Sequence, residues 1–167
     1  RRLRAPGLES LVGAGVFYGA ATVQAQGLAG QRVFVVGGGN SAGQAALHLA
    51  KYARQVSILV RSATLATSMS EYLIRQIDNT SNVDVRYGVD VTGGGGDGRL
   101  EHVRLRDRDS GATESQPAAG LFVLIGAEPF TGWLPEVVAR DRWGYVLTGA
   151  DTGRHWPLPR APFLLET

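Results

Sequence analysis

Residues 31–53, QRVFVVGGGNSAGQAALHLAKYA, decide how this chain folds. They open with a β-branched and aromatic run at 32–36, which is typical of a strand buried on both faces of a parallel sheet. Three glycines follow, and beyond them apolar residues recur at helical spacing while Gln44, His48 and Lys51 fall on the opposite side. The stretch therefore predicts a strand, a tight turn and a helix.

The turn has the G-x-G-x-x-A spacing of a dinucleotide-binding motif, at Gly37, Gly39 and Ala42. Gly37 allows the sharp turn, Gly39 omits the Cβ that would collide with a pyrophosphate, and Ala42 lets the helix lie close to the strand. A glycine-rich turn can also merely join a strand to a helix. Because the strand and the helix that the motif requires are both present, we predict nucleotide binding.

The phosphate site is expected at the start of the helix. The first N–H groups there have no partner within the helix, and the positive end of the helix dipole adds to their attraction for an anion. We expect the backbone N–H groups of Asn40 and Ser41 to reach a phosphate oxygen, and the Ser41 hydroxyl is a further candidate donor. Gly38, between the two motif glycines, completes the predicted cofactor-binding set at this end.

Composition excludes several classes of protein. Of the 167 residues, 44% are hydrophobic and 19% are charged, which is a globular rather than a disordered composition. The net charge is only +2 with the basic residues scattered, so no nucleic-acid partner is expected, and no apolar run approaches the length of a membrane span. The chain has no cysteine, which excludes a disulfide framework, a thiolate metal site and a redox-active dithiol within it.

The rest of the chain predicts an α/β, Rossmann-like, three-layer domain with a central parallel sheet and a β-meander crossover. A capping box at Ser68 and Glu71 is expected to begin the second helix. Short antiparallel strands joined by glycine-rich turns stand where a further helix would be usual. In chain order we expect a strand at 15–18, a helical turn at 20–26, a parallel strand at 55–60, a helix at 69–78 and a strand at 83–87. The meander is expected to run from a strand at 89–92 through a glycine turn at 93–98 to a strand at 100–106. A buried strand at 120–125 then returns to the parallel sheet.

These segments resemble the NADPH-binding domain of thioredoxin-reductase-like flavoproteins, and most nearly the bacterial ones fused to a cyclic-nucleotide-binding or response-regulator module. The resemblance covers nearly the whole chain. It rests on the order and spacing of GAGVFYGA (13–20), VVGGGNSAGQAALHLA (35–50), LVRSATLATSMSEYL (59–73), GLFVLIGAEP (120–129) and WGYVLTG (143–149).

The resemblance implies a chain cut from a longer cytoplasmic protein, an expectation that agrees with the missing initiator Met and signal core. Residues 1–14 would connect from a flavin domain, 15–129 would bind NAD(P)H, and 130–167 would return toward the flavin domain with Trp133, Trp143 and Trp156 packed against it. FAD would then bind only in the parent protein, which would pass hydride from NADPH to FAD and onward to an acceptor.

Two departures from that family bear on function. A Cys-x-x-Cys pair is expected just after the first strand, and the matching residues are Gly19, Ala20, Ala21 and Thr22. The acceptor therefore stays open among a ferredoxin-like or flavodoxin-like carrier, a quinone, oxygen, and a disulfide elsewhere in the parent. The family's His-Arg-Arg-x-x-x-Arg also becomes VRSATLA at 60–66, which keeps only the first arginine.

NADPH is favoured over NADH by the end of the second parallel strand. An NAD site places a carboxylate there for the ribose hydroxyls, and Val60 supplies none. Arg61 is positioned to pair with a 2′-phosphate, with Ser62 and Thr64 as neutral donors and Arg75 as a more distant candidate. The alternative for Arg61 is a solvated loop arginine.

The nicotinamide end is expected at Gly126 and Ala127, after the returning strand, although a tight turn closed by Pro129 explains them equally well. Hydride transfer needs orientation rather than an acid or base, so no catalytic residue is predicted. The three histidines share no ligand spacing and are interpreted as surface residues, so no metal is expected.

Two rival functions remain. One is a nonenzymatic dinucleotide-sensing Rossmann module. The other is part of a flavoprotein related to ferredoxin or flavodoxin NADP reductases or to monooxygenases. The sequence leaves open whether the parent is a homodimer.

Overall fold

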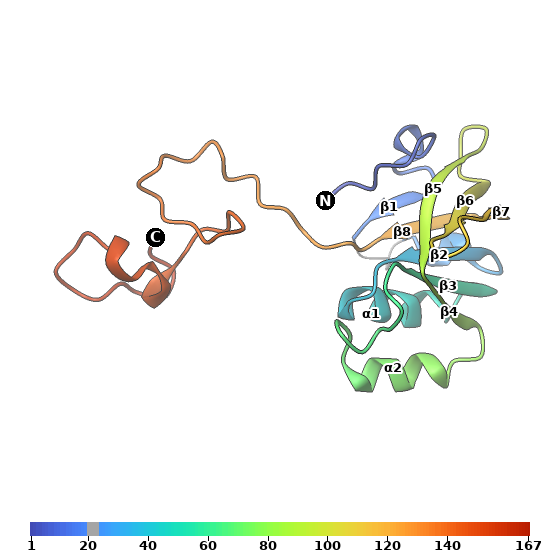
Figure 1. Cartoon of the computed structure of the whole chain (residues 1–167), viewed down its shortest axis with the longest axis horizontal. Helices are drawn as coiled ribbons and strands as arrows, with labels where there is room; N and C mark the ends of the chain where they lie inside the picture. Colours follow the sequence, from blue (N-terminus) through green and yellow to red (C-terminus); the bar gives the residue numbers. More distant parts are fainter. Residues whose placement is uncertain (20–23) are drawn as a thin grey trace. The chain divides into compact units, whose positions relative to one another are not determined.

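The computed structural model describes residues 1–19 and 24–167 and divides the chain into two compact units. The larger unit is Arg2–Gly126 and, among the described residues, holds both α-helices and all the strands of the two sheets (Figure 1). The smaller unit is Ala127–Thr167, with Arg1 assigned to it. Each unit is described by itself.

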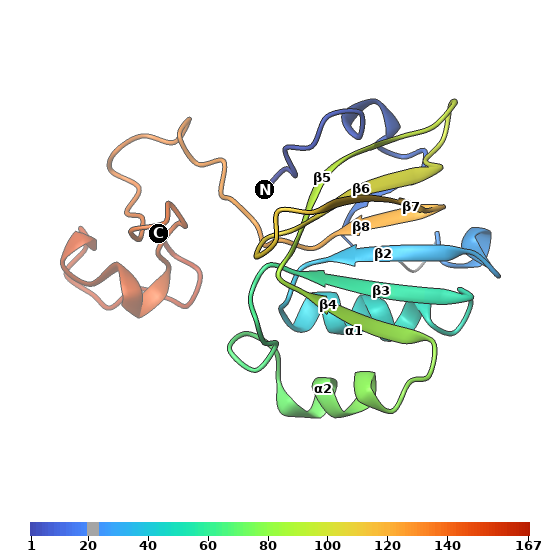
Figure 2. The same cartoon turned by 45° about the vertical axis from the view of Figure 1, so that its right-hand side comes forward.

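A five-stranded parallel sheet forms the centre of the larger unit, as predicted. Its order is β1 (Val16–Tyr18), β8 (Gly120–Val123), β2 (Arg32–Val36), β3 (Gln55–Val60) and β4 (Val83–Tyr87). Helices α1 (Asn40–Leu49) and α2 (Glu71–Asp78) cover one face, and the antiparallel strands β5 (Val89–Gly95), β6 (His102–Asp107) and β7 (Thr113–Pro117) cover the other (Figure 2). The α/β Rossmann-like class and the meander crossover are confirmed.

Alternation along the central strands divides the interior into two cores. On β2, Val33 and Val35 face α1, whereas Phe34 and Val36 face the meander, because successive side chains of a strand point to opposite faces. The helix core includes Val33, Val35, Ala42, Ala46, Leu49, Val56, Ile58, Val60, Met69, Leu73, Ile77 and Phe122. The meander core includes Ala5, Leu8, Leu11, Val16, Phe34, Val36, Leu59, Val91, Val103, Leu105, Leu121 and Val123.

The segment before β1 packs into the meander core through Ala5, Leu8 and Leu11, the last in a short 3-10 helix, η1 (Glu9–Leu11). It lies alongside β5, where the Gly94 N–H donates to the carbonyl of Pro6 at 3.2 Å (Figures 1 and 2). This contact shows why β5 contains glycines.

The glycine turn expected at 93–98 is wrong for its first part, because β5 runs through Gly95 and the chain bends only at 97–99. A Cβ on Gly94 would stand 2.5 Å from Leu8 Cδ2 and 2.7 Å from the carbonyl oxygen of His102. The strand therefore uses glycine to admit the N-terminal segment. A β-bulge between Val91 and Gly93 accompanies the close approach.

Three other boundaries differ from the sequence predictions. Helix α2 begins at Glu71, after Ser70, whose side chain makes no cap hydrogen bond, whereas at the other end the Asn79 side chain donates to the Arg75 carbonyl at 2.8 Å. Strand β8 ends at Val123 rather than at residue 125. The helical turn expected at 20–26 falls largely on residues 20–23, which lie outside the described residues, and a 3-10 helix, η2, occupies Gln26–Leu28.

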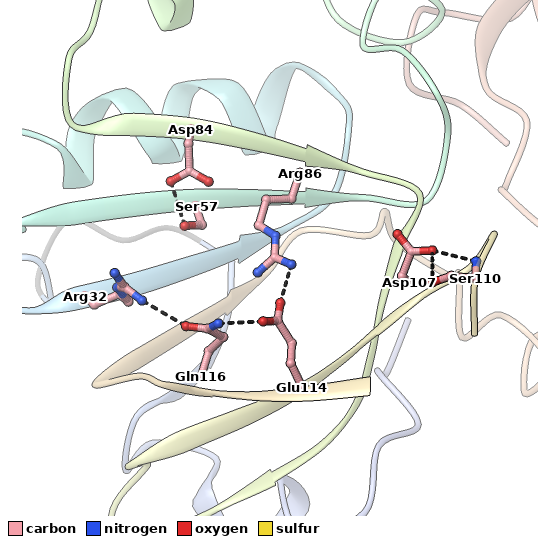
Figure 3. A network of polar contacts seen from close by, with 8 residues as sticks. All are labelled: Arg32, Ser57, Asp84, Arg86, Asp107, Ser110, Glu114 and Gln116. Atoms are coloured by element: carbon pink, nitrogen blue, oxygen red, sulfur yellow. Dashed lines mark hydrogen bonds and ion pairs between the residues drawn. The ribbon is translucent and has the colours of Figure 1, made fainter. Parts of the chain in front are cut away.

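A chain of polar side chains ties the meander to the parallel sheet (Figure 3). Arg32 on β2 donates to Gln116 on β7 at 2.9 Å, and Gln116 donates to Glu114 at 2.7 Å. Glu114 also pairs with Arg86 on β4. The hydrogen bond from Arg86, followed by that from Gln116, holds the pKa of the Glu114 carboxyl below its usual value.

The smaller unit has little regular structure. It contains one isolated bridge, between Arg140 and Val146, and a kinked 3-10 helix, η3 (Gly149–His155). The Arg140 guanidinium donates to the carbonyls of Thr131 and Leu134 at 3.1 and 2.7 Å. Phe130, Trp133 and Trp143 are 87%, 81% and 61% exposed within this chain. Among the described residues of both units, no helix has the length and apolar character of a membrane span.

Candidate functional site

The predicted turn lies where the order of the parallel sheet reverses. From β2 the chain continues to β3 and β4 on one side, whereas β8 lies on the other side of β2, with Val36 beside Val123. In open α/β sheets, ligands bind in the crevice outside the carboxyl ends of the strands at such a switch point. Gly37–Gly39 occupy this place.

Gly37 is required by the protein itself. Its φ is +142°, and a Cβ would stand 2.3 Å from the carbonyl oxygen of Leu124, just beyond β8. A side chain would therefore separate the ends of β2 and β8. Gly38 is also close to its surroundings, since a Cβ there would lie 3.0 Å from Val60 Cγ1.

Gly39 is different, because no atom of the described residues requires it to be glycine. Its φ is −91°, an ordinary value, and the nearest heavy atom to a Cβ would be the carbonyl oxygen of Ser68 at 3.7 Å. Gly39 is the residue before α1, and its carbonyl accepts from the N–H groups of Ala42 and Gly43 at 3.0 and 3.2 Å. Because Gly39 has no side chain, the backbone just before α1 is open to close approach.

Helix α1 begins at Asn40, so the backbone N–H groups of Asn40 and Ser41 belong to its first turn, where no carbonyl of the helix reaches them. The Asn40 side chain turns away to accept from the Ser70 N–H at 2.7 Å. Ser41 is exposed, and Ala42 is fully buried in the helix core.

Two contacts brace this turn against the loop after β3, and the sequence analysis missed both. Ser68 Oγ donates to the Gly38 carbonyl at 2.9 Å, and Asn40 accepts from Ser70. The capping box predicted for Ser68 and Glu71 is therefore wrong, because the Ser68 hydroxyl bonds to the glycine turn instead. A local spacing rule cannot detect a partner 30 residues away.

The residues proposed for a 2′-phosphate are spread over the end of β3 and the loop after it. Arg61 is exposed and lines a cavity of about 430 Å³ on the meander side of the sheet, whereas Val60 is buried in the helix core. Ser62 Oγ donates to the carbonyl of Thr64 at 2.8 Å, and Thr64 Oγ1 accepts from the Ala66 N–H at 3.1 Å, so both hydroxyls shape their own loop.

Arg75 does not join Arg61. It pairs with Glu71 one turn earlier on the exposed surface of α2. Among the described residues, the cavity beside Arg61 instead brings in Arg2 and Arg4, which the sequence analysis had placed in a connector. No periodicity or motif marks these two arginines.

The structure places Gly126 and Ala127 in different units. Gly126 ends the larger unit with φ +85°, and apart from its chain neighbours no heavy atom of the described residues lies within 4 Å of where its Cβ would be. Ala127 begins the smaller unit, where its carbonyl accepts from the Tyr145 hydroxyl at 3.4 Å. Their part in binding nicotinamide stays a prediction.

Of the three predicted surface histidines, only His155 is exposed. His48 is half-buried, with its ring centroid 5.7 Å from that of Tyr52, and His102 is half-buried on β6. Within the described ranges, 1–19 and 24–167, no group of three or more histidine, cysteine or acidic residues could hold a metal. Of the residues matching the family's cysteine pair, Ala20, Ala21 and Thr22 lie outside the described part.

Residues 1–152 match the sequence profile of the pyridine nucleotide-disulphide oxidoreductases. The chain belongs to this family. It is 37% identical over 156 residues to NADPH-dependent thioredoxin reductase 3 of Arabidopsis thaliana, covering 91% of this chain and 29% of the relative. It is 34% identical over 125 residues to a thioredoxin reductase of Neurospora crassa, covering 73% of this chain and 36% of the relative.

The fold of this pyridine nucleotide-disulphide oxidoreductase agrees with solved structures. The crystal structure of T. acidophilum thioredoxin reductase matches 90% of this chain and 49% of its own, with a TM-score of 0.80 and 26% identity. The chain thus spans less than half of each of these relatives. It is thioredoxin-reductase-like in sequence and in fold.

Proposed function

We propose that this chain binds NADPH as the nicotinamide-nucleotide module of a thioredoxin-reductase-like flavoprotein. The pyrophosphate lies over Gly39 and accepts from the N–H groups of Asn40 and Ser41 at the start of α1. The parent protein binds FAD elsewhere, passes hydride from NADPH to that flavin, and then reduces an acceptor. When bound, the nicotinamide supplies the hydride, and this chain supplies orientation.

Gly39 carries this proposal. The protein's own atoms leave room for a Cβ there, with the closest at 3.7 Å, and the backbone angles do not require glycine. A glycine that its own fold does not need is explained by a second molecule approaching the backbone, as a pyrophosphate does in this motif.

The choice of NADPH rests on the residues that end β3. Val60 is buried and offers no oxygen to a ribose hydroxyl, while the exposed Arg61 offers a guanidinium to a 2′-phosphate. Ser62 remains a proposed neighbour of that phosphate, since a hydroxyl that donates to Thr64 can still accept a hydrogen bond.

The absence of cysteine from this chain limits which electron acceptors the parent protein can use. With no cysteine, this chain cannot pass electrons through a dithiol of its own, so the parent reduces a carrier, a quinone, oxygen or a disulfide held elsewhere. The same observation favours a second candidate, a module that senses the nucleotide without catalysis. A flavin-binding motif in the reading frame on either side of this segment would favour the reductase, and its absence would favour the sensor.

Titration calorimetry of the 167-residue chain with NADPH and NADH tests the proposal. Gly39→Ala should weaken NADPH binding about tenfold or more by obstructing the pyrophosphate, with little change in unfolding free energy. Gly27→Ala is the matched control, because no heavy atom of the described residues lies within 4 Å of where its Cβ would be, its chain neighbours aside, and it lies away from the turn. Equal binding by Gly39→Ala and the unaltered chain would place the pyrophosphate elsewhere, and no binding of either nucleotide would refute the proposal.

Fusion to a cyclic-nucleotide-binding or response-regulator module, a cytoplasmic location and a homodimeric parent remain predictions of the sequence.

A further inference from the structure

We infer that Arg2 and Arg4, from the segment before β1, bind the 2′-phosphate of NADPH together with Arg61. They are specificity-determining residues that replace arginines missing from the loop after β3. The inference rests on the proposed function and names the groups that select NADPH over NADH.

The first observation is a shared cavity. Arg2, Arg4 and Arg61 all line the space of about 430 Å³ on the meander side, although Arg61 is far from the other two in sequence. Val36, the last residue of β2, and Ile125, just beyond β8, line it as well. The cavity therefore opens at the carboxyl ends of the strands on either side of the switch point, next to the glycine turn.

The second observation is that the segment is held in place. Leu3 lies between the two arginines and packs half-buried against the meander core, and its N–H donates to the Tyr18 hydroxyl at 3.1 Å. Ala5 is buried in the same core. Because Leu3 and Ala5 anchor the backbone, the exposed side chains of Arg2 and Arg4 extend from an ordered segment.

The third observation is an imbalance of charge. The cavity is lined by four arginines, Arg106 among them, and by one carboxylate, Asp90. Asp90 already pairs with Arg106 at 3.2 Å and lies 3.9 Å from Arg108. Within residues 1–19 and 24–167, no carboxylate forms an ion pair with Arg2, Arg4 or Arg61.

Three unneutralised guanidinium groups around one cavity repel one another, and a dianionic phosphate would offset that repulsion. The cavity is thus suited to a phosphate monoester and unsuited to the bare ribose hydroxyls of NADH. In the family that this sequence resembles, two further arginines follow Arg61, and Ser62 and Ala66 stand in their places. Arg2 and Arg4 restore the number of guanidinium groups from the other side.

The test compares NADPH and NADH affinities of the full chain by calorimetry at one ionic strength. The double variant Arg2→Gln/Arg4→Gln should lose about tenfold or more in NADPH affinity and leave NADH affinity unchanged, since each charge-assisted hydrogen bond contributes that order of effect. Arg61→Gln should show the same pattern. The matched control is Arg54→Gln/Arg99→Gln, two exposed arginines lining a different cavity, and it should change neither affinity by more than about twofold.

Each other outcome is decisive. If the chain prefers NADPH and only Arg61→Gln removes the preference, this inference is overturned while the proposed function stands. If the double variant weakens NADPH and NADH equally, the arginines do not read the 2′-phosphate. If the unaltered chain binds neither nucleotide, the proposed function and this inference fail together. Far-UV circular dichroism of each variant confirms that the fold is retained.

Discussion

Two glycine runs in this chain look alike in sequence and serve opposite purposes. Gly37–Gly39 follow β2 at the switch point, and Gly93–Gly95 lie within β5. A Cβ on Gly94 would meet Leu8 and the His102 carbonyl, whereas a Cβ on Gly39 would have no neighbour closer than 3.7 Å. Gly94 makes room for the chain's own N-terminal segment, whereas Gly39 leaves room that no described residue fills.

The difference shows that a glycine motif is interpreted by what occupies the place of its missing side chain. At Gly94 the occupant is protein, so the glycine serves packing. At Gly39 the described residues supply no occupant, so the glycine favours a ligand. Gly37 combines features of both, because it belongs to the turn proposed to bind the pyrophosphate but packs against Leu124.

The largest effect is expected at Gly37. Gly37→Ala would force a side chain into a φ of +142° and 2.3 Å from the Leu124 carbonyl oxygen. The unfolding free energy should fall by about 3 kcal/mol or more, from backbone strain and overpacking together. Urea unfolding followed by far-UV circular dichroism measures it, since α1 and α2 both belong to the larger unit. A loss as small as that of Gly39→Ala would erase the distinction between these two glycines.

The next effect is expected in the other run. Gly94→Ala should lower the unfolding free energy by about 1–3 kcal/mol through overpacking. Part of this loss should disappear when Leu8 is also changed to Ala, because Leu8 Cδ2 is the nearest atom to the new Cβ, at 2.5 Å. Strict additivity of the two substitutions would show that the segment and β5 do not compete for the same space.

A smaller effect is expected where the loop braces the binding turn. Ser68→Ala removes the hydrogen bond to the Gly38 carbonyl and should cost about 0.5–1.5 kcal/mol of unfolding free energy. NADPH affinity should fall with it, because the turn loses a brace. Thr80→Val is the control, since that hydroxyl also donates to a backbone carbonyl, that of Gln76 at 2.7 Å, but lies just beyond α2 and away from the turn. Equal losses of NADPH affinity in the two variants would contradict a specific role for Ser68 in bracing the turn.

The smallest effect concerns how stability depends on pH, and it comes from the polar side chains that tie β7 to the parallel sheet. The folded state lowers the Glu114 pKa from its ordinary 4.5, so the Arg86 pair adds stability above that value and loses it as the pH falls through the lowered pKa. The side chains of Arg86 and Glu114 are 33% and 43% exposed, so Glu114→Gln should cost only about 0.5 kcal/mol at neutral pH. It should also flatten the decline of stability below pH 4.5. An unchanged acid profile would exclude this contribution, with Asp97→Asn in an exposed turn as the control.

The sequence predicted the parts of the fold that periodicity and spacing specify. The step from β2 through Gly37 to α1 follows from a change in apolar period over adjacent residues, so no distant contact is needed to infer it. The meander could be placed for the same reason, from alternation such as that of Val103 and Leu105 with their arginine neighbours.

What could not be predicted depends on partners remote in sequence. Glycine is unfavourable in strands, so residues 93–98 suggested a turn, and only the contact with Pro6 and Leu8 explains why Gly93–Gly95 belong to β5. Ser68 fits a capping box equally well, and only tertiary structure shows its bond to Gly38. No local pattern in the sequence marks Arg2 and Arg4, because only the folded structure brings them to the cavity that Arg61 also lines.

The place of β8 between β1 and β2 bears on how the protein is made. Strand β1 pairs with β8 through Val16 and Leu121, so during synthesis β1 waits until residues 120–123 have been made before this neighbour exists. Until then β2 keeps an open edge, which is the surface of a nascent chain most prone to wrong pairing. Ribosome-bound chains that end before β8 therefore expose the edge of β2 that β8 later covers.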